Sequence, residues 1–211
     1  MTRVKICGLT NEEDAMLAAN LGADYLGFNL VKDSKRKVSI KNLKEIISKL
    51  PPFVTPVGVF VNEEIIEIQK TVKKTGLKIV QLHGDESLEY ITQLSELVQT
   101  PIIKAIKISD ENALNIIPQY LEKTQYLLLD TFVLDQPGGT GQSFDWELAV
   151  KVKDYNKPFF LAGGLTPENV AVAIEKIQPF AVDVASGVER LERRKDYDKM
   201  KLFIKKVKGL K

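Results

Sequence analysis

The sequence has very few of the side chains that build disulfide frameworks and metal centres. It holds one cysteine, Cys7, and one histidine, His83, among its 211 residues. A single cysteine excludes an internal disulfide and any zinc site made of several thiolates, and a single histidine argues against a histidine-rich metal site. We therefore expect that any chemistry carried out by this chain proceeds without a metal.

The sequence also lacks long apolar runs and a large excess of charge of one sign. No apolar stretch approaches the roughly 18 residues that cross a bilayer, and the N-terminus lacks the apolar segment of a secretory signal. The formal net charge is +2, with lysines spread along the chain rather than massed in one block. We expect a cytoplasmic protein with neither a membrane nor a nucleic-acid partner.

Short runs rich in β-branched and aromatic residues alternate with amphipathic stretches along the whole chain. This alternation is typical of βα units. Strands are predicted at residues 4–7, 25–28, 55–61, 78–82, 101–106, 126–129, 158–162 and 180–184. About eight such units predict a (β/α)8 TIM barrel, with an open doubly wound sheet as the alternative. No linker-like segment divides the chain, so we expect one barrel domain over residues 1–211.

Capping residues and prolines predict where several helices begin and end. Asn62 is expected to cap a helix, Pro118 to end a short helix capped by Asp110, and Pro167 to occupy the first position of another. The lysine-rich C-terminal segment is expected to form a helix that docks on the barrel, because it has apolar residues at helical spacing: Met200, Leu202, Phe203 and Val207.

The residues that follow the strands of a barrel share one face, where barrel enzymes place their active sites. On this face we expect Cys7, Arg36 of the charged loop 29–38, His83, Asp130, and the pairs Gly163-Gly164 and Ser186-Gly187. The glycines after the seventh and eighth strands indicate a phosphate site, because glycine lets the backbone approach an anion closely. For Cys7 alone, a buried thiol that acts as a small apolar side chain is the alternative.

Several short motifs, in order along essentially the whole chain, resemble those of phosphoribosylanthranilate isomerases. They are Lys5-Ile6-Cys7-Gly8-Leu9-Thr10 and the segments at 81–84, 128–131, 138–146, 161–170 and 182–189. The resemblance implies a cofactor-free barrel enzyme of tryptophan biosynthesis. Its reaction is the Amadori rearrangement of N-(5-phosphoribosyl)anthranilate to 1-(2-carboxyphenylamino)-1-deoxyribulose 5-phosphate. The resemblance also assigns a general base to Cys7, a general acid to Asp130 and the anthranilate carboxylate to Arg36.

That reaction needs an acid to open the ribose ring and a base to take the C2′ proton. The first and sixth strands of a closed eight-stranded ring lie nearly opposite each other, so Cys7 and Asp130 can flank a sugar. At pH 7 an ordinary cysteine, with a pKa of about 8.5, and an ordinary aspartic acid, with a pKa of about 3.9, both hold the wrong protonation state. We therefore expect a cation such as Lys5 or Arg36 to lower the pKa of Cys7.

Other residues have less certain roles in this interpretation. We expect His83 to be a hydrogen-bonded structural residue, and Asp183, within the eighth strand, to line the barrel or contact the substrate amine. The loop 131–142 is expected to close over the substrate, because Gly138, Gly139 and Gly141 make its backbone flexible.

The loop after the second strand departs from the family pattern at Asn29 and Leu30, which leaves the contacts of the anthranilate ring open. Two other functions remain possible for a barrel with these glycine loops. One is that of another sugar-phosphate-binding barrel enzyme, and the other is that of a catalytically silent barrel that holds a sugar phosphate. The substrate is a small molecule in each case, and we expect a monomer or a homodimer.

Overall fold

The computed structural model describes residues 1–130 and 146–209, and eight parallel strands in it form a closed barrel. Each strand pairs with the next along the chain, and β1 closes the ring by pairing with β8. The strands are β1 Arg3–Ile6, β2 Tyr25–Asn29, β3 Thr55–Phe60, β4 Ile79–Leu82, β5 Ile102–Lys107, β6 Tyr126–Asp130, β7 Phe159–Ala162 and β8 Ala181–Val184. The predicted strands and the predicted closed barrel are confirmed.

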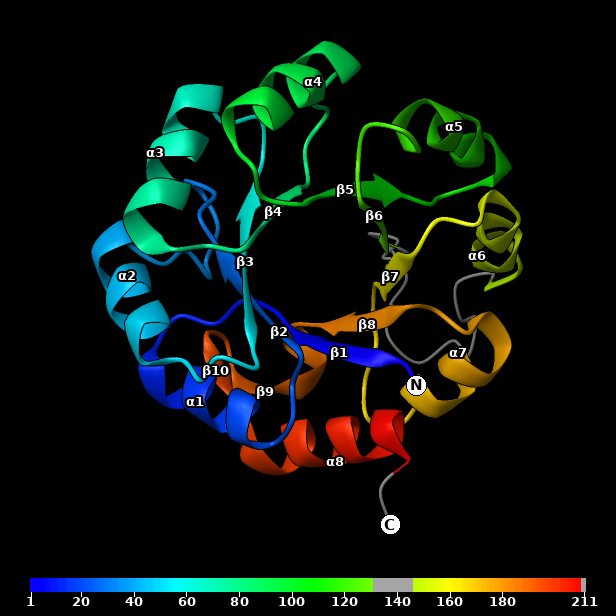
Figure 1. Cartoon of the computed structure of the whole chain (residues 1–211). Helices are drawn as coiled ribbons and strands as arrows, with labels where there is room; N and C mark the ends of the chain where they lie inside the picture. The colour runs from blue at the N-terminus through cyan, green and yellow to red at the C-terminus, as the bar shows by residue number, and fades with distance from the viewer. Residues whose placement is uncertain (131–145, 210–211) are drawn as a thin grey trace.

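Helices form a ring around the barrel (Figure 1). They are α1 Glu12–Asn20, α2 Ile40–Lys49, α3 Ile65–Thr75, α4 Leu88–Leu97, α5 Ile117–Tyr120, α6 Trp146–Lys151, α7 Val170–Ile177 and α8 Tyr197–Lys208. The described residues also contain three short 3-10 turns. They are η1 Glu111–Ile116, which runs into α5, η2 Val152–Tyr155, which follows α6, and η3 Ser186–Val188, which follows β8. None of the helices within these described ranges is long and apolar enough to cross a membrane.

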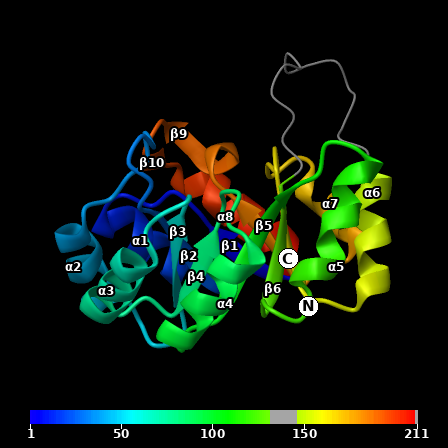
Figure 2. The same ribbon diagram turned by 90° about the horizontal axis from the view of Figure 1, so that it is seen from above.

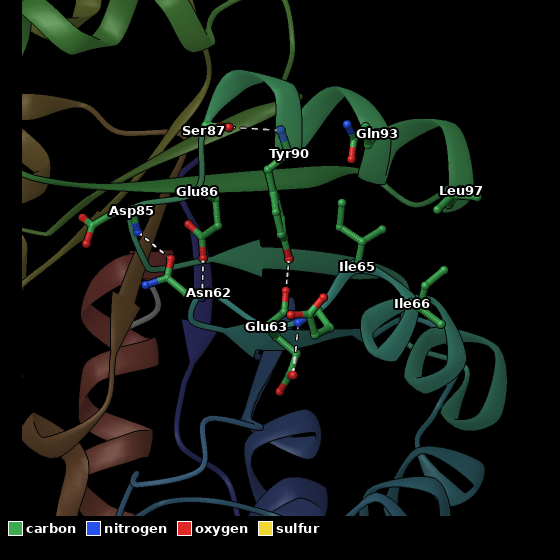
Figure 3. A pocket seen from close by; sticks show the side chains of 11 residues that line it. Asn62, Glu63, Ile65, Ile66, Asp85, Glu86, Ser87, Tyr90, Gln93 and Leu97 are labelled. Atoms are coloured by element: carbon green, nitrogen blue, oxygen red, sulfur yellow. Dashed lines mark hydrogen bonds between the residues drawn. The ribbon is translucent and has the colours of Figure 1, made fainter.

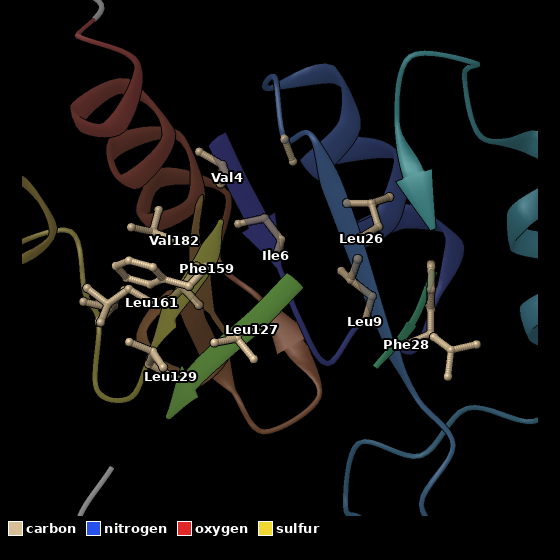
Figure 4. Close-up of a cluster of buried hydrophobic side chains, with 14 of the residues drawn as sticks. Val4, Ile6, Leu9, Leu26, Phe28, Leu127, Leu129, Phe159, Leu161 and Val182 are labelled. Atoms are coloured by element: carbon tan, nitrogen blue, oxygen red, sulfur yellow. The ribbon is translucent and has the colours of Figure 1, made fainter. Parts of the chain in front are cut away.

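Alternation along each strand divides the core into two layers. One set of strand residues faces outward and packs against the helices, as Val4, Ile6, Leu127 and Leu161 do in Figure 4. The other set faces the barrel axis. At the end where the strands begin, this inner layer is apolar and includes Tyr25, Val57, Ile79, Ile103, Leu128, Phe160 and Ala181. One or two steps further along the strands, the inward positions become polar and form the floor of a cavity.

Two helix starts differ from the prediction. Asn62 does not cap α3. Its backbone has a φ of 48°, and its side-chain Oδ1 accepts the N–H of Asp85 in the next βα loop. Helix α7 begins at Val170 rather than at Pro167. The Thr166 hydroxyl accepts the N–H of Glu168 and its carbonyl accepts the N–H of Val170, so residues 167–169 form a capped turn that precedes the regular helix.

Pro118 and Leu202 also behave differently from the prediction. Asp110 caps η1 as expected, but Pro118 lies in the first turn of α5, where a missing N–H costs nothing, and so it begins a helix instead of ending one. In α8, Met200, Phe203 and Val207 are buried, whereas Leu202 is 42% exposed. The docked terminal helix is therefore confirmed, with a narrower apolar face.

Candidate active site

A cavity of about 390 Å³ opens at the end of the barrel where the strands finish. It is lined by residues at the ends of β2, β3, β4, β6, β7 and β8 and from the loops that follow β1, β2, β4, β7 and β8, among them Cys7, Arg36, His83, Asp130, Gly163, Gly164, Asp183, Ser186 and Gly187. The structure thus brings the site residues expected from the sequence to one place. The proposed lid glycines, Gly138, Gly139 and Gly141, lie outside the described residues.

Cys7 lies at the cavity floor beside an ion pair that the sequence did not reveal. Lys5 is completely buried, and its Nζ donates to Oδ2 of Asp183 at 2.9 Å from the neighbouring strand β8. A Cβ on Gly27 would lie 2.6 Å from the Cys7 sulfur and 3.1 Å from the Lys5 Nζ. The thiol and the ammonium therefore border the same small space, which exists because residue 27 has no side chain.

The electrostatics around Cys7 correct the predicted lowering of its pKa. Displacement of water by the surrounding protein raises the pKa of the thiol above its usual value, and the charge of Asp183 adds to this. The charges of Lys5 and Lys195 act in the opposite direction but do not outweigh burial. Lys5 thus acts on the thiol in the predicted direction, but the net shift of the pKa is upward, because burial contributes more than the cations do.

Asp130 ends a short chain of polar side chains across the mouth of the barrel. Oδ2 of Asp130 lies 3.2 Å from Nε2 of His83, and Nδ1 of His83 lies 2.9 Å from Nε2 of Gln81. The roles of the ring nitrogens follow from the tautomer: where the Gln81 amide donates to Nδ1, the imidazole proton lies on Nε2 and points at Asp130. Gln81 was missed from the sequence, although its inward direction follows from its position two residues before His83.

Arg36 reaches the cavity from the loop after β2 and forms a two-point ion pair there. Its Nε and Nη2 donate to the two carboxylate oxygens of Glu189 at 2.8 and 2.6 Å. Gly8 allows this path, because a Cβ at that position would lie 2.5 Å from Cδ of Arg36. Glu189 starts β9 (Glu189–Leu191), which pairs with β10 (Arg194–Lys195) in a hairpin that the sequence analysis did not predict.

Backbone conformation and close contacts require glycine at three positions in the last two βα loops. Gly163 and Gly164 have φ values of 95° and 63°, in the left-handed region that L side chains rarely adopt. A Cβ on Gly187 would lie only 2.0 Å from the carbonyl oxygen of Leu165, so the loops after β7 and β8 touch here. Of the two residues that depart from the family pattern, Asn29 lines the cavity and Leu30 is buried in the core.

A larger cavity, of about 580 Å³, lies outside the barrel between the starts of α3 and α4 (Figure 3). Its polar groups already bond to one another: the Tyr90 hydroxyl donates to the carbonyl of Glu63, and Glu86 accepts the N–H of Asn62. Burial and the neighbouring carboxylates raise the pKa of Tyr90 to about 12, so this phenol stays neutral. The cavity at the barrel mouth is therefore the candidate active site.

Comparisons with known proteins point to one family. A family model described as N-(5'phosphoribosyl)anthranilate (PRA) isomerase matches residues 4–206. N-(5'-phosphoribosyl)anthranilate isomerase of Thermotoga neapolitana is 46% identical over 211 residues, covering 100% of both chains.

Two solved structures are similar to this chain over 100% of both chains. One is a phosphoribosyl anthranilate isomerase in complex with reduced 1-(o-carboxyphenylamino)-1-deoxyribulose 5-phosphate, with a TM-score of 0.89 at 43% identity. The other contains monomers generated from the dimeric phosphoribosylanthranilate isomerase of Thermotoga maritima, with a TM-score of 0.89 at 42% identity. This chain therefore belongs to the phosphoribosylanthranilate isomerase family.

Proposed function

We propose that Cys7 and Asp130 are the general base and the general acid of this chain's isomerase reaction. The reaction is that of its family, the aldose–ketose rearrangement of N-(5-phosphoribosyl)anthranilate in tryptophan biosynthesis. The observation that carries the assignment is that the two side chains line one cavity from β1 and β6, which lie nearly opposite each other in the closed ring. A sugar between them is within reach of both groups.

The chemistry divides between the two residues. Asp130 in its protonated form gives a proton to the ring oxygen of the ribose while the bond from C1′ to that oxygen breaks and the nitrogen lone pair forms an imine at C1′. Cys7 as the thiolate then takes the proton from C2′, and the resulting enolamine tautomerises to the 2-ketone. The Nε2 proton of His83 points at Oδ2 of Asp130 and holds this carboxyl group in place once its proton has left.

The thiolate must be made available even though the pKa of Cys7 is raised. Oδ1 of Asp183 is buried, and no described residue is placed to donate a hydrogen bond to it. A substrate amine or hydroxyl that donates to Oδ1 would offset the carboxylate charge and leave the Lys5 ammonium to stabilise the thiolate. Asp183 thus acts both as a substrate contact and as a control on the base.

The remaining cavity residues suit the two anionic ends of the substrate. Arg36 would bind the anthranilate carboxylate, because a guanidinium offers paired N–H groups that match a carboxylate. The loops with Gly163, Gly164, Ser186 and Gly187 would hold the phosphate, at the place where many barrels bind one. Residues 131–142, the proposed lid, connect directly to Asp130.

We also propose that residues 1–211 work as a single barrel domain that assembles into a homodimer. The support is the relative from Thermotoga maritima, which is described as dimeric and resembles this chain over its full length. Light scattering coupled to gel filtration tests this, because the chain has a mass of 23.7 kDa and a dimer has twice that mass.

The catalytic assignment is tested by mixing the purified protein with N-(5-phosphoribosyl)anthranilate and following the loss of anthranilate-type fluorescence. Wild type should convert the substrate, and Cys7→Ala and Asp130→Asn should each lower kcat by about 10²- to 10⁴-fold. Asp110→Asn, an exposed helix cap, is the matched control and should retain the wild-type rate. Substrate binding without conversion by wild type would instead indicate the silent barrel, and full rates in both variants would refute the assignment.

A further inference from the structure

The hairpin β9–β10 is bound to the loop after β2 by two ion pairs of different character. One joins Arg36 to Glu189, whose carboxylate is 6% exposed. The other joins Lys35 to Glu192, whose side chains are 75% and 48% exposed. Figure 2 shows the hairpin as a small unit above the barrel strands, and the two pairs join it to a loop that is far away in sequence. The buried pair lies at the cavity, and the exposed pair lies away from it.

Glu189 occupies only one edge of the Arg36 guanidinium. A guanidinium has five N–H donors in a fixed plane. Nε and one N–H of Nη2 point at Glu189, which leaves the second N–H of Nη2 and one N–H of Nη1 side by side on the adjacent edge, while the last N–H of Nη1 lies beside Cδ. The two N–H groups on the adjacent edge form a second fork that can donate to another carboxylate in the same plane. Arg36 lines the cavity, so this second fork is available to a ligand there.

Two lysine side chains hold Glu189 in place. Its Oε1 also accepts from Nζ of Lys195, at 3.1 Å, and the Lys195 side chain is 0% exposed. The same Nζ donates to the carbonyl of Ala185, and Nζ of Lys199 donates to the Glu189 carbonyl, both at 2.9 Å. Burial would raise the pKa of Glu189, but the hydrogen bond from Arg36 and the charge of Lys195 bring it below its usual value. The carboxylate is therefore ionised at neutral pH and held by Lys195 of β10, and the backbone of the same residue is held by Lys199 of α8.

We propose that Glu189 is a positioning residue that holds one edge of Arg36 so that the other edge meets the carboxylate of the substrate. Glu189 itself does not touch the substrate. The inference rests on the carboxylate-binding role proposed for Arg36 above. The consequence is specific: loss of Glu189 should weaken the binding of ligands that carry the aromatic carboxylate and should leave the binding of ligands without it unchanged.

The experiment compares Glu189→Gln with Glu192→Gln, a matched control in the same hairpin whose exposed pair contributes little. Dissociation constants are measured by calorimetry for two ligands. Reduced 1-(o-carboxyphenylamino)-1-deoxyribulose 5-phosphate carries the carboxylate, and ribulose 5-phosphate does not. Glu189→Gln should raise the dissociation constant of the first ligand by about 10- to 100-fold, as expected for a charge-assisted hydrogen bond, and should change that of the second ligand by no more than about twofold. In kinetics, KM should rise far more than kcat falls.

The outcomes separate this inference from the proposed function. If Arg36→Lys leaves the binding of the carboxylated ligand unchanged, the proposed role of Arg36 fails and the inference fails with it. If Arg36→Lys weakens that ligand and Glu189→Gln does not, or if Glu189→Gln weakens both ligands equally, the inference alone is wrong. Should Glu189→Gln not fold, Glu189→Asp decides, because it keeps the charge but withdraws it by one methylene group and should give a smaller loss confined to the carboxylated ligand.

Discussion

Replacing Asp183 by asparagine should lower the pKa of the Cys7 thiol. In the native site, Asp183 opposes the thiolate in two ways. Its negative charge raises the thiol pKa directly, and it engages the Lys5 ammonium through a bond of 2.9 Å. Asparagine is nearly isosteric but uncharged, so the variant removes the carboxylate charge and leaves the positive charge of Lys5 to act on the sulfur.

The size of the shift follows from the geometry. The thiol and the ammonium border the space beside Gly27, within 2.6 and 3.1 Å of the same point. Charges at such short range shift a pKa by about one to three units, and each unit corresponds to about 1.4 kcal/mol. We therefore expect the thiol pKa to fall by about one to three units in Asp183→Asn. Lys5→Met in the Asp183→Asn background should reverse the fall, because it removes the cation.

The assay is the rate of alkylation by iodoacetamide as a function of pH. The thiolate is the reactive form, and Cys7 is the only cysteine in the sequence, so the titration reports one group. Asp110→Asn, the same exchange at an exposed cap, should leave the curve unchanged. An alkylation midpoint in Asp183→Asn that equals or exceeds the wild-type midpoint would refute the reasoning. So would a double variant whose midpoint stays as low as that of Asp183→Asn.

Three substitutions test the packing around the site. Gly27→Ala should lower the free energy of unfolding, measured in urea, by about 1–3 kcal/mol and also lower kcat, because its Cβ would lie 2.6 Å from the Cys7 sulfur; unchanged values would contradict this. Lys104→Met should lower the free energy of unfolding by about 3–5 kcal/mol, because it leaves the buried Glu86 carboxylate without the cation that lies 2.7 Å away. A urea midpoint equal to that of wild type would show that the pair is dispensable. Gly187→Ala should weaken the binding of inorganic phosphate, measured by calorimetry, because its Cβ would lie 2.0 Å from the Leu165 carbonyl oxygen and displace the loop. An unaltered affinity would place the phosphate site elsewhere.

Local sequence signals were sufficient for the strands and for most of the cavity lining. Short apolar runs such as residues 126–129 and 158–162, alternating with amphipathic stretches, predict the strands, and about eight such units favour a closed barrel over an open sheet. Once the ring is closed, any residue just after a strand lies at the mouth. Cys7, His83 and Asp130 could therefore be grouped without knowledge of a single contact.

Contacts between distant segments could not be predicted in this way. Glu189 and Arg36 are 153 residues apart, and the hairpin that joins them has only a few residues with ordinary propensities. The pairing of Lys5 with Asp183 depends on the register between β1 and β8, which closes the barrel and has no local signature. The sign of the pKa shift at Cys7 could not be predicted either, because the sequence shows a nearby lysine but neither the burial of the thiol, which raises the pKa most, nor the carboxylate that engages the lysine.

The most direct test of Cys7 as the base is the pH dependence of kcat/KM in wild type and in Asp183→Asn. This ratio reports the free enzyme, whose reactive form carries a thiolate on Cys7 and a proton on Asp130, so its pH profile has one limb for each group. Because the pKa of Cys7 lies above its usual value, the limb that belongs to the thiol should lie on the alkaline side of neutrality in wild type. In Asp183→Asn the limb that belongs to the thiol should move to lower pH by the same interval as the alkylation midpoint. A profile whose two limbs both stay in place while the alkylation midpoint moves would show that another group takes the C2′ proton.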